Sequence, residues 1–544
     1  MVSAEQTHFA LRRAGALPRL LLEPAIAAAA AAAFYVSLYG QLPYHDVLRF
    51  VAQIDSGKFV WDMGHVWLQP VTLLWHWYLG FGESAEQSQK HINTVFAAAG
   101  IGVFYFALMR FEVGLWQRVV AAALVAASCN ILTLAPTGHM KLLALPFLTA
   151  AFYFAAAWER DLAASCARTR TLVWSGAFLA LAAAFHSSCL AAPPFVGLVI
   201  LLSSLRRGHG WVKGLGRAAL YGAIVGVLFL ALLELARLAF FGQWLTPDTF
   251  TATVGAKDAL RTGWFSWSDL AGRMVFGTVN NFIAAPELGP VMRAWLLHQI
   301  PSLAPYAGRL ILQAVPWFAT LALLATVYLR AAWLSLRGAA LMMPLAFIIG
   351  SLSWNLFFNI NEPEHWFHLT VPTVFLFLMV TPPLLARAAL PIWAGVTIAL
   401  NLALWAVPEA RYPLDRYQAQ LARDYSANDL FLYFVTYGGG PNMSFFHLPT
   451  PHLVLDQLYE QSQDASVFFG AVRQNVDATL GHGGRVVVFE ALDPANWNAP
   501  WMLLTRDGMP KAKFVGFFDS RYKVMPLGEI AGMKAWQLTP RASN

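Results

Sequence analysis

The chain has 544 residues, of which 58% are hydrophobic and only 12% are charged. Because soluble domains carry roughly 25% charged residues, this composition excludes an ordinary soluble protein and indicates an integral membrane protein. The net charge of +7 requires no nucleic-acid partner, since short cytoplasmic loops of membrane proteins collect Lys and Arg. Three cysteines, all in or beside apolar segments, imply no disulfide framework.

The apolar segments predict an α-helical polytopic membrane protein. A helix needs about 20 apolar residues to cross the hydrocarbon core of a bilayer. The first candidate follows Arg12, Arg13 and Arg19 and lacks a small-residue cleavage site, so we expect an uncleaved span. Eleven spans are predicted: 22–40, 92–110, 115–134, 140–158, 171–187, 188–205, 215–240, 308–329, 338–356, 367–385 and 388–407.

Residues 65–81 form a shorter, Trp-rich apolar stretch that we expect to lie on the membrane as an interfacial or re-entrant helix. If this stretch crossed, the loop with Arg160, Arg168 and Arg170 would face the exterior, against the positive-inside rule. With the N-terminus in the cytoplasm, eleven spans place the C-terminus outside. The external regions are then 41–91, 241–307 and 408–544.

The composition changes after Pro408, where charged and turn residues return. We therefore predict a membrane domain over 1–407 and a small α/β domain over 408–544, outside the membrane. Within this tail we expect a helix over 452–478 and strands over 429–436 and 485–490, with further short strands near 513–518 and 534–538. Residues 438–440, three glycines, lack the spacing and the Lys of a nucleotide loop, so we interpret them as a turn.

Ionisable residues gather in the first external loop, where six of them fall within twenty positions: Asp46, Arg49, Asp55, Lys58, Asp62 and His65. Asp46 and Arg49 share one face of a short helix. A carboxylate there can accept a proton from an acceptor group while the guanidinium holds a phosphate. The same pattern also fits a solvated amphipathic helix with a local ion pair, and the residues alone favour neither interpretation.

Three short motifs resemble the GT-C class of glycosyltransferases, in the branch of the aminoarabinose transferase and the protein O-mannosyltransferases. Residues 46–50 (DVLRF) resemble the Asp-x-x-Arg-Tyr motif of the first outer loop, with Phe in place of Tyr. Residues 64–70 (GHVWLQP) are similar to the entry of the second surface helix in some members. Residues 361–365 (NEPEH) resemble an outer Pro-Glu-Arg-Tyr turn, with His365 replacing the Arg. By this resemblance Asp46 is the catalytic carboxylate.

The resemblance also implies substrate-binding roles for residues of the other outer turns. His139 and Lys141 occupy a turn where members of the class often hold a basic residue for the lipid phosphate, although a lysine snorkelling at a helix end is an equal interpretation. His186 lies at another outer turn and either faces the cavity or bonds to nearby backbone. Glu364 and His365, with His368 nearby, lack a diagnostic metal spacing. We expect neither a metal site nor another cofactor.

The hypothesis that follows is a bacterial inner-membrane glycosyltransferase of the cell envelope, with its C-terminal domain in the periplasm. It would move a sugar from a polyprenyl-phosphate donor to a glycan, lipid or protein acceptor at the outer face of the bilayer, with inversion. Two other classes stay open. A transporter or flippase of lipid-linked glycans would favour internal repeats and helices broken at mid-membrane, and no repeat is found in the sequence. A polymerase or ligase would favour a His and Arg cluster in the late outer loop, which 241–307 lacks.

Overall fold

The computed structural model describes residues 4–40, 47, 51, 53–57, 59, 65–253, 267–296, 302–357, 366–434, 445, 448–455, 458–459, 464–493 and 511–541. Contacts between Cα atoms divide the chain into two compact units. Unit 1 comprises Met1–Tyr39, Asp46–Ala284 and Val315–Val407. Unit 2 comprises Gly40–His45, Ala285–Ala314 and Pro408–Asn544.

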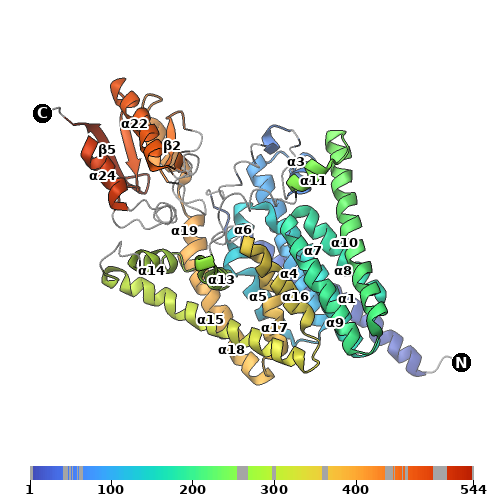
Figure 1. Cartoon of the computed structure of the whole chain (residues 1–544). Helices are drawn as coiled ribbons and strands as arrows, with labels where there is room; N and C mark the ends of the chain where they lie inside the picture. The colour runs from blue at the N-terminus through green and yellow to red at the C-terminus, as the bar shows by residue number, and fades with distance from the viewer. Residues whose placement is uncertain are drawn as a thin grey trace. The chain divides into compact units, whose positions relative to one another are not determined.

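Unit 1 is built of helices, and its long members α4, α7, α8, α9 and α10 run alongside one another (Figure 1). Its helices are α1 (Ala4–Val36), α3 (Leu68–Leu79), α4 (Ala85–Arg110), α5 (Leu115–Ala126), α6 (Cys129–Thr137), α7 (Leu145–Ala163), α8 (Thr169–Phe185), α9 (Ala192–Arg206), α10 (Gly210–Phe241), α11 (Pro247–Thr253), α13 (Trp267–Asn280), α16 (Met342–Phe357), α17 (Phe367–Val380) and α18 (Pro383–Asn401). Helix α15 (Ala307–Leu336) begins in unit 2 and continues into unit 1. Short turns complete the unit: the 3₁₀ turns η1 (Met140–Ala144) and η2 (Ser187–Ala191), and the π-helical turn η5 (Leu402–Ala406).

Each of the eleven predicted spans coincides with helical structure. Within the described residues, six helices are long and apolar enough to cross a membrane, and four shorter apolar helices accompany them. The protein is therefore a multi-pass membrane protein. One prediction is wrong in detail: residues 115–134 do not form a single helix, because α5 and α6 meet at a bend of 63°.

Asn401 stabilises the bend between α5 and α6. Its side-chain amide donates to the carbonyl oxygens of Ala127 and Phe282, each at 2.7 Å, and its Oδ1 accepts from the backbone N–H of Ala284 at 2.7 Å. These backbone groups lie where helices end, so no helical partner is available to them. Because hydrocarbon offers no hydrogen bonds, a buried side chain has to supply them.

A second set of hydrogen bonds involves Asn281, which directly precedes Phe282 in the chain. The Nδ2 groups of Asn130 and Asn281 both donate to the hydroxyl of Thr370, at 3.2 and 3.1 Å. All three side chains are completely buried or nearly so. The network therefore ties α6, the end of α13 and α17 together inside an otherwise apolar bundle.

Helix α3 is the segment predicted to lie on the membrane surface. It has 12 residues, which corresponds to about 18 Å at 1.5 Å per residue. The hydrocarbon core is about 30 Å thick, so α3 alone is too short to cross it. Its Trp77 and Tyr78 are exposed. The first loop packs on this helix through Ile54, which joins a buried cluster with Leu73 and Ala85.

Unit 2 contains a five-stranded mixed sheet with the strand order β2-β1-β3-β5-β4. Its strands are β1 (Leu430–Tyr433), β2 (His452–Val454), β3 (Val486–Phe489), β4 (Tyr522–Ile530) and β5 (Met533–Pro540). Strands β1, β2 and β3 are parallel, whereas β5 is antiparallel to both β3 and β4. Its helices and turns include α14 (Leu288–Leu296), η3 (Ala304–Tyr306), α19 (Val407–Ala410), α20 (Leu414–Asp424), α22 (Ala465–Gly481) and α24 (Lys511–Arg521).

Both faces of this sheet are buried, which explains the continuous apolar strands β1 and β3. Leu430 and Leu432 point to one face and pack in a cluster with apolar side chains of α22 and α24. Phe431 and Tyr433 alternate to the other face and pack in a cluster with Leu421 of α20. The sheet is therefore covered by helices on its two sides, as in α/β proteins.

Three predictions for the tail need correction. Residues 452–454 form β2, so the predicted helix over 452–478 begins only at Ala465. The predicted strand over 513–518 lies within helix α24, because Phe514, Phe517 and Phe518 recur at helical spacing and bury one face. Strand β4 was not predicted. The predicted turn at 438–440 lies outside the described residues.

Asp429 ties the starts of β1 and β3 together. Its carboxylate accepts hydrogen bonds from the backbone N–H groups of Ser426 and Arg485, both at 2.8 Å, and from the Arg485 guanidinium at 2.9 Å. Burial raises the pKa of Asp429, but the hydrogen bonds from Arg485 and Ser426 outweigh it and hold the pKa at about 2. The ionised carboxylate is therefore the form that stabilises this sheet.

The Asn401 network predicts that Asn401→Ala lowers the free energy of unfolding by about 3 kcal/mol, because the carbonyl of Ala127 and the N–H of Ala284 lose their partner and the carbonyl of Phe282 keeps only its bond from the Cys129 N–H. Thermal unfolding of the purified protein in detergent measures this effect. Asn475→Ala is the matched control, since Asn475 is exposed on α22, and it should change stability by less than about 0.5 kcal/mol. Equal melting temperatures for the two variants would contradict the role given to Asn401.

The Asp429 contacts predict a pH-dependent loss of order in unit 2. A carboxyl group whose folded pKa is lowered stabilises the fold above its ordinary pKa of about 3.9. This contribution disappears as the pH falls towards the folded pKa of about 2. Hydrogen exchange of β1 and β3 in the full chain should therefore be faster in Asp429→Asn than in the wild type at pH 6. The difference should shrink towards pH 2, and a difference that persists there would refute this interpretation.

Candidate functional site

Three histidines from three distant segments meet at one end of unit 1. His65 precedes α3, His186 separates α8 from η2, and His368 lies in the first turn of α17. The ring centroids of His65 and His186 are 4.7 Å apart, and those of His186 and His368 are 5.7 Å apart. With Ser188, which contacts two of the rings, these residues are here called the histidine cluster.

Ser188 connects the cluster by hydrogen bonds. Its backbone N–H donates to His186 Nδ1 at 3.2 Å. Its Oγ is hydrogen-bonded both to His186 Nδ1 and, at 2.7 Å, to His368 Nε2. His65 Nδ1 lies 3.4 Å from the carbonyl oxygen of Phe185. His186, Ser188 and His368 are all buried, so these bonds form in a medium of low dielectric constant, where they are strengthened.

The local backbone explains why these residues meet. Helix α8 ends at Phe185 because His186 adopts an extended conformation, with φ −150° and ψ 111°. The chain then turns through η2, which brings Ser188 back beside the His186 ring. The backbone N–H of Trp67 donates to the carbonyl oxygen of Ala184 at 3.2 Å. This bond holds the segment that carries His65 against the end of α8.

His139 and Lys141 lie at the same end of unit 1. The rings of Phe147 and Phe185 stack at 5.4 Å, so the start of α7 lies beside the end of α8. Turn η1, which directly precedes α7, contacts α4 and α8. His139 is 1% and Lys141 5% exposed. The end of unit 1 formed by η1, η2 and the starts of α3 and α17 is called the histidine end.

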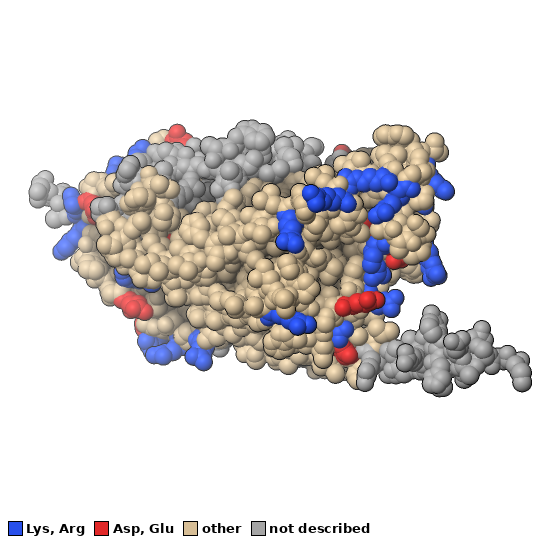
Figure 2. Space-filling view, turned by 90° about the horizontal axis from the view of Figure 1, so that it is seen from below, with Lys and Arg blue, Asp and Glu red and all other residues tan. Residues whose placement is uncertain are grey.

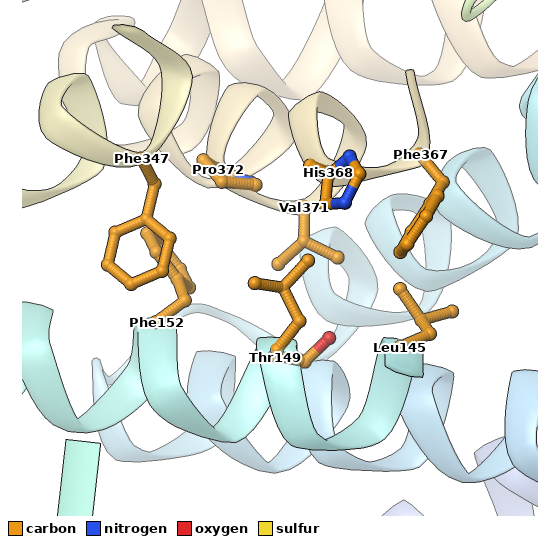
Figure 3. Close-up of a pocket in the computed structure, with 9 residues that line it drawn as sticks. Leu145, Thr149, Phe152, Phe347, Phe367, His368, Val371 and Pro372 are labelled. Atoms are coloured by element: carbon orange, nitrogen blue, oxygen red, sulfur yellow. The ribbon is translucent and has the colours of Figure 1, made fainter. Parts of the chain in front are cut away.

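A small pocket extends from the cluster into the bundle between α7, α16 and α17 (Figure 3). Its volume is about 10 Å³, which is room for about one water molecule. Its polar lining consists of His368 and Thr149, and the rest is apolar, with Leu145, Phe367 and Phe347 among it. It is therefore too small to hold a polyprenyl chain by itself.

The opposite helix ends of unit 1 carry most of its described cations: Arg110, Arg118, Arg160, Arg168, Arg170, Arg206, Arg207, Lys213, Arg217, Arg330, Arg337 and Arg387. These helix ends are together called the arginine end. Arg160 donates to the carbonyl oxygen of Arg110 at 2.8 Å, and Arg206 donates to that of Ser335 at 2.7 Å. Glu159 accepts from the first two backbone N–H groups of α16, at 3.0 and 2.8 Å. The view from below shows more Lys and Arg than Asp and Glu (Figure 2).

The structure brings together only some of the predicted site residues. His65 and His186 are in ring contact, and His139 and Lys141 are buried at the same end of unit 1. Asp55 is exposed, although its neighbour Ile54 is buried. The remaining predicted site residues lie outside the described residues: Asp46, Arg49, Lys58, Asp62, Glu364 and His365.

Two residues of the cluster were missed by the sequence reasoning as members of a site. Ser188 follows His186 by two positions in an apolar region, and this proximity was the available signal. His368 opens an apolar span and was considered only as a metal ligand. Within the described part of the chain, no group of three or more His, Cys, Asp or Glu side chains could hold a metal ion. The cluster is organised by hydrogen bonds and ring contacts.

Comparison with known proteins gives structural likeness without sequence similarity. No protein-family model and no curated protein sequence matches the chain. The chain is similar to ArnT, an aminoarabinose transferase, from Cupriavidus metallidurans bound to undecaprenyl phosphate, with 12% identity, a TM-score of 0.46, and coverage of 96% of this chain and 98% of that one. The apo state of that ArnT gives 13% identity, a TM-score of 0.47 and coverage of 94% and 97%.

An oligosaccharyltransferase from Archaeoglobus fulgidus in the apo form is also similar, with 13% identity, a TM-score of 0.46, and coverage of 92% of this chain and 73% of that chain. Both of these proteins are glycosyltransferases of the GT-C type. At such identities and TM-scores, no residue role and no substrate passes from these proteins to this chain.

Proposed function

We propose that this protein is a membrane glycosyltransferase that moves a sugar from a polyprenyl-phosphate donor to an acceptor at the outer face of the bilayer. The observation that carries the proposal is the gathering of His65, His186, His368 and Lys141 at one end of a membrane bundle. Ionisable groups at membrane depth are costly and usually functional. A lipid-linked phosphate holds its charge at the surface of the bilayer, with its tail in the hydrocarbon.

The chemistry of such a transfer requires one base and several cations. Asp46 would take the proton of the acceptor nucleophile, which attacks the anomeric carbon and inverts it while the bond to the phosphate oxygen breaks. Arg49, helped by Lys141 and His365, would neutralise the leaving phosphate. The other predicted residues would bind the sugar or the acceptor: Asp55, Lys58, Asp62, His65, His139, His186 and Glu364. Support for Asp46 and Arg49 comes from the sequence motif at 46–50.

The segregation of charge supports the proposed orientation. The arginine end would face the cytoplasm, because cytoplasmic loops collect Lys and Arg. The histidine end and the C-terminal domain over 408–544 would then lie in the periplasm of a bacterial inner membrane. A donor would enter from the outer leaflet, and the acceptor would arrive from the aqueous side.

A second candidate is a transporter or flippase of lipid-linked glycans. The bend between α5 and α6, with its buried Asn and Thr side chains, is the kind of broken helix that transporters use. In this chain, however, the amide groups of Asn401 and Asn130 are hydrogen-bonded to protein backbone and side chains. An assay with vesicles separates the two candidates, since a flippase moves the lipid across the bilayer without transferring its sugar.

Asp46→Asn is expected to lower sugar transfer by about 10²- to 10⁴-fold, because the amide cannot accept the proton. The measurement is transfer from radiolabelled polyprenyl-phosphate sugars by the purified protein in vesicles. Asp161→Asn provides the matched control, since Asp161 lies at the arginine end, and it should leave transfer unchanged. Full activity of Asp46→Asn would remove Asp46 from the mechanism.

The proposed orientation predicts the side from which Cys166 reacts. Cys166 is exposed in the turn between α7 and α8, whereas Cys129 and Cys189 are buried. A membrane-impermeant maleimide should therefore label the wild type in inverted vesicles and not in spheroplasts. Asn475→Cys in a Cys166→Ser background should show the reverse, because Asn475 belongs to unit 2. Labelling of both positions from the same side would overturn the orientation.

A further inference from the structure

The Ser188 hydroxyl contacts two imidazole nitrogens, His186 Nδ1 and His368 Nε2. A hydroxyl group has one proton to donate and two lone pairs to accept with. At most one of the two nitrogens can therefore accept from Oγ, and at least one must carry a proton and donate to it. The contact alone does not say which is which.

The backbone of Ser188 decides the direction. Its N–H donates to His186 Nδ1 at 3.2 Å, so Nδ1 presents a lone pair and carries no proton. The hydroxyl of Ser188 then also donates to His186 Nδ1, and His368 donates its Nε2–H to Ser188 Oγ. Because Nδ1 of His186 is unprotonated, the proton of this neutral imidazole is on Nε2. The chain of donors runs from His368 through Ser188 to His186.

We propose that Ser188 and His368 are positioning residues that hold His186 as an Nε2–H donor, and that this N–H binds an oxygen of the leaving polyprenyl phosphate. This inference rests on the proposed function. An N–H group suits an anionic oxygen, whereas the opposite tautomer would aim a lone pair at it. Lys141 is buried at the same end of unit 1.

The surroundings of the cluster keep the donor in place. Phe367 stacks on the His368 ring at 3.9 Å, and its own ring lies 5.9 Å from that of His186. His186 is 3% and His368 6% exposed. A donor fixed by packing and hydrogen bonds needs little reorganisation when charge develops on the leaving group, which is the condition for electrostatic stabilisation of a transition state.

The tautomer is measured directly by nitrogen NMR of ¹⁵N-histidine-labelled protein in membranes, with the His186 signals assigned by their loss in His186→Gln. Wild type should show an unprotonated Nδ1 and a protonated Nε2. Ser188→Ala keeps the backbone N–H bond to Nδ1 but loses the hydroxyl, so the His186 Nδ1 signal should shift while the tautomer persists. Ser188→Thr, which keeps the hydroxyl, should restore the wild-type signals. Ser187→Ala is the matched control, because Ser187 is buried but makes no side-chain hydrogen bond among the described residues. Identical spectra for Ser188→Ala and wild type would overturn the relay.

The ligand is tested with undecaprenyl phosphate and, as its uncharged counterpart, undecaprenol. Ser188→Ala should weaken binding of undecaprenyl phosphate about tenfold, the loss expected for one hydrogen bond to a charged group. Undecaprenol binding should not change. His368→Leu should behave like Ser188→Ala, whereas His368→Gln should resemble wild type, since its amide N–H can replace the imidazole N–H.

The two measurements separate failure of this inference from failure of the proposed function. If wild type does not bind undecaprenyl phosphate, the proposed function and the phosphate ligand both fail, while the spectra still decide the relay. If wild type binds it and Ser188→Ala binds equally well, the role of the cluster in phosphate binding is wrong. An equal loss of undecaprenol affinity in Ser188→Ala would likewise overturn it, because the contact would then not depend on phosphate.

Discussion

Every polar group inside a membrane bundle needs a partner within the protein, because hydrocarbon supplies none. In the described part of unit 1, two places where the chain leaves the helix meet this constraint. Asn401 bonds the backbone of Ala127 at the bend between α5 and α6 to the segment that follows α13, and Ser188 bonds two imidazoles after the end of α8. Hydrogen bonding of these polar groups stabilises the helix breaks. At the histidine end it also fixes which groups donate and which accept. Fold and candidate chemistry therefore depend on one requirement.

Most of the helical architecture could be predicted from the sequence, since the eleven predicted apolar segments each coincide with helical structure, of which six helices are long and apolar enough to cross a membrane in the described part of the chain. The bend at 127–128 escaped prediction because Ser128 and its neighbours interrupt the apolar run by too little. In the tail, the buried strands β1 and β3 were recognisable as continuous apolar runs. Helix α24 was mistaken for a strand, because four apolar or aromatic residues among the six at 513–518 hide a helical spacing that only packing on the sheet makes visible.

The candidate site was predictable to a lesser degree. His65 and His186 were selected because ionisable residues stand out among apolar neighbours, and the structure places their rings in contact. Ser188 and His368 could not be selected, because 180 residues separate them and nothing in the local pattern pairs a serine with that histidine. Lys141 was weighed as a snorkelling side chain, yet it is buried. Such pairings arise from tertiary packing, so no single segment of the sequence predicts them.

The proposed function requires that a polyprenyl phosphate bind at the histidine end of unit 1. The most direct measurement is photocrosslinking with an undecaprenyl phosphate whose first isoprene unit carries a diazirine, followed by mass spectrometry of the peptides. Crosslinks are expected at residues near His65, His186 and His368, and unlabelled undecaprenyl phosphate should compete with them. Competed crosslinks confined to the arginine end, around Arg160 and Arg206, would contradict it.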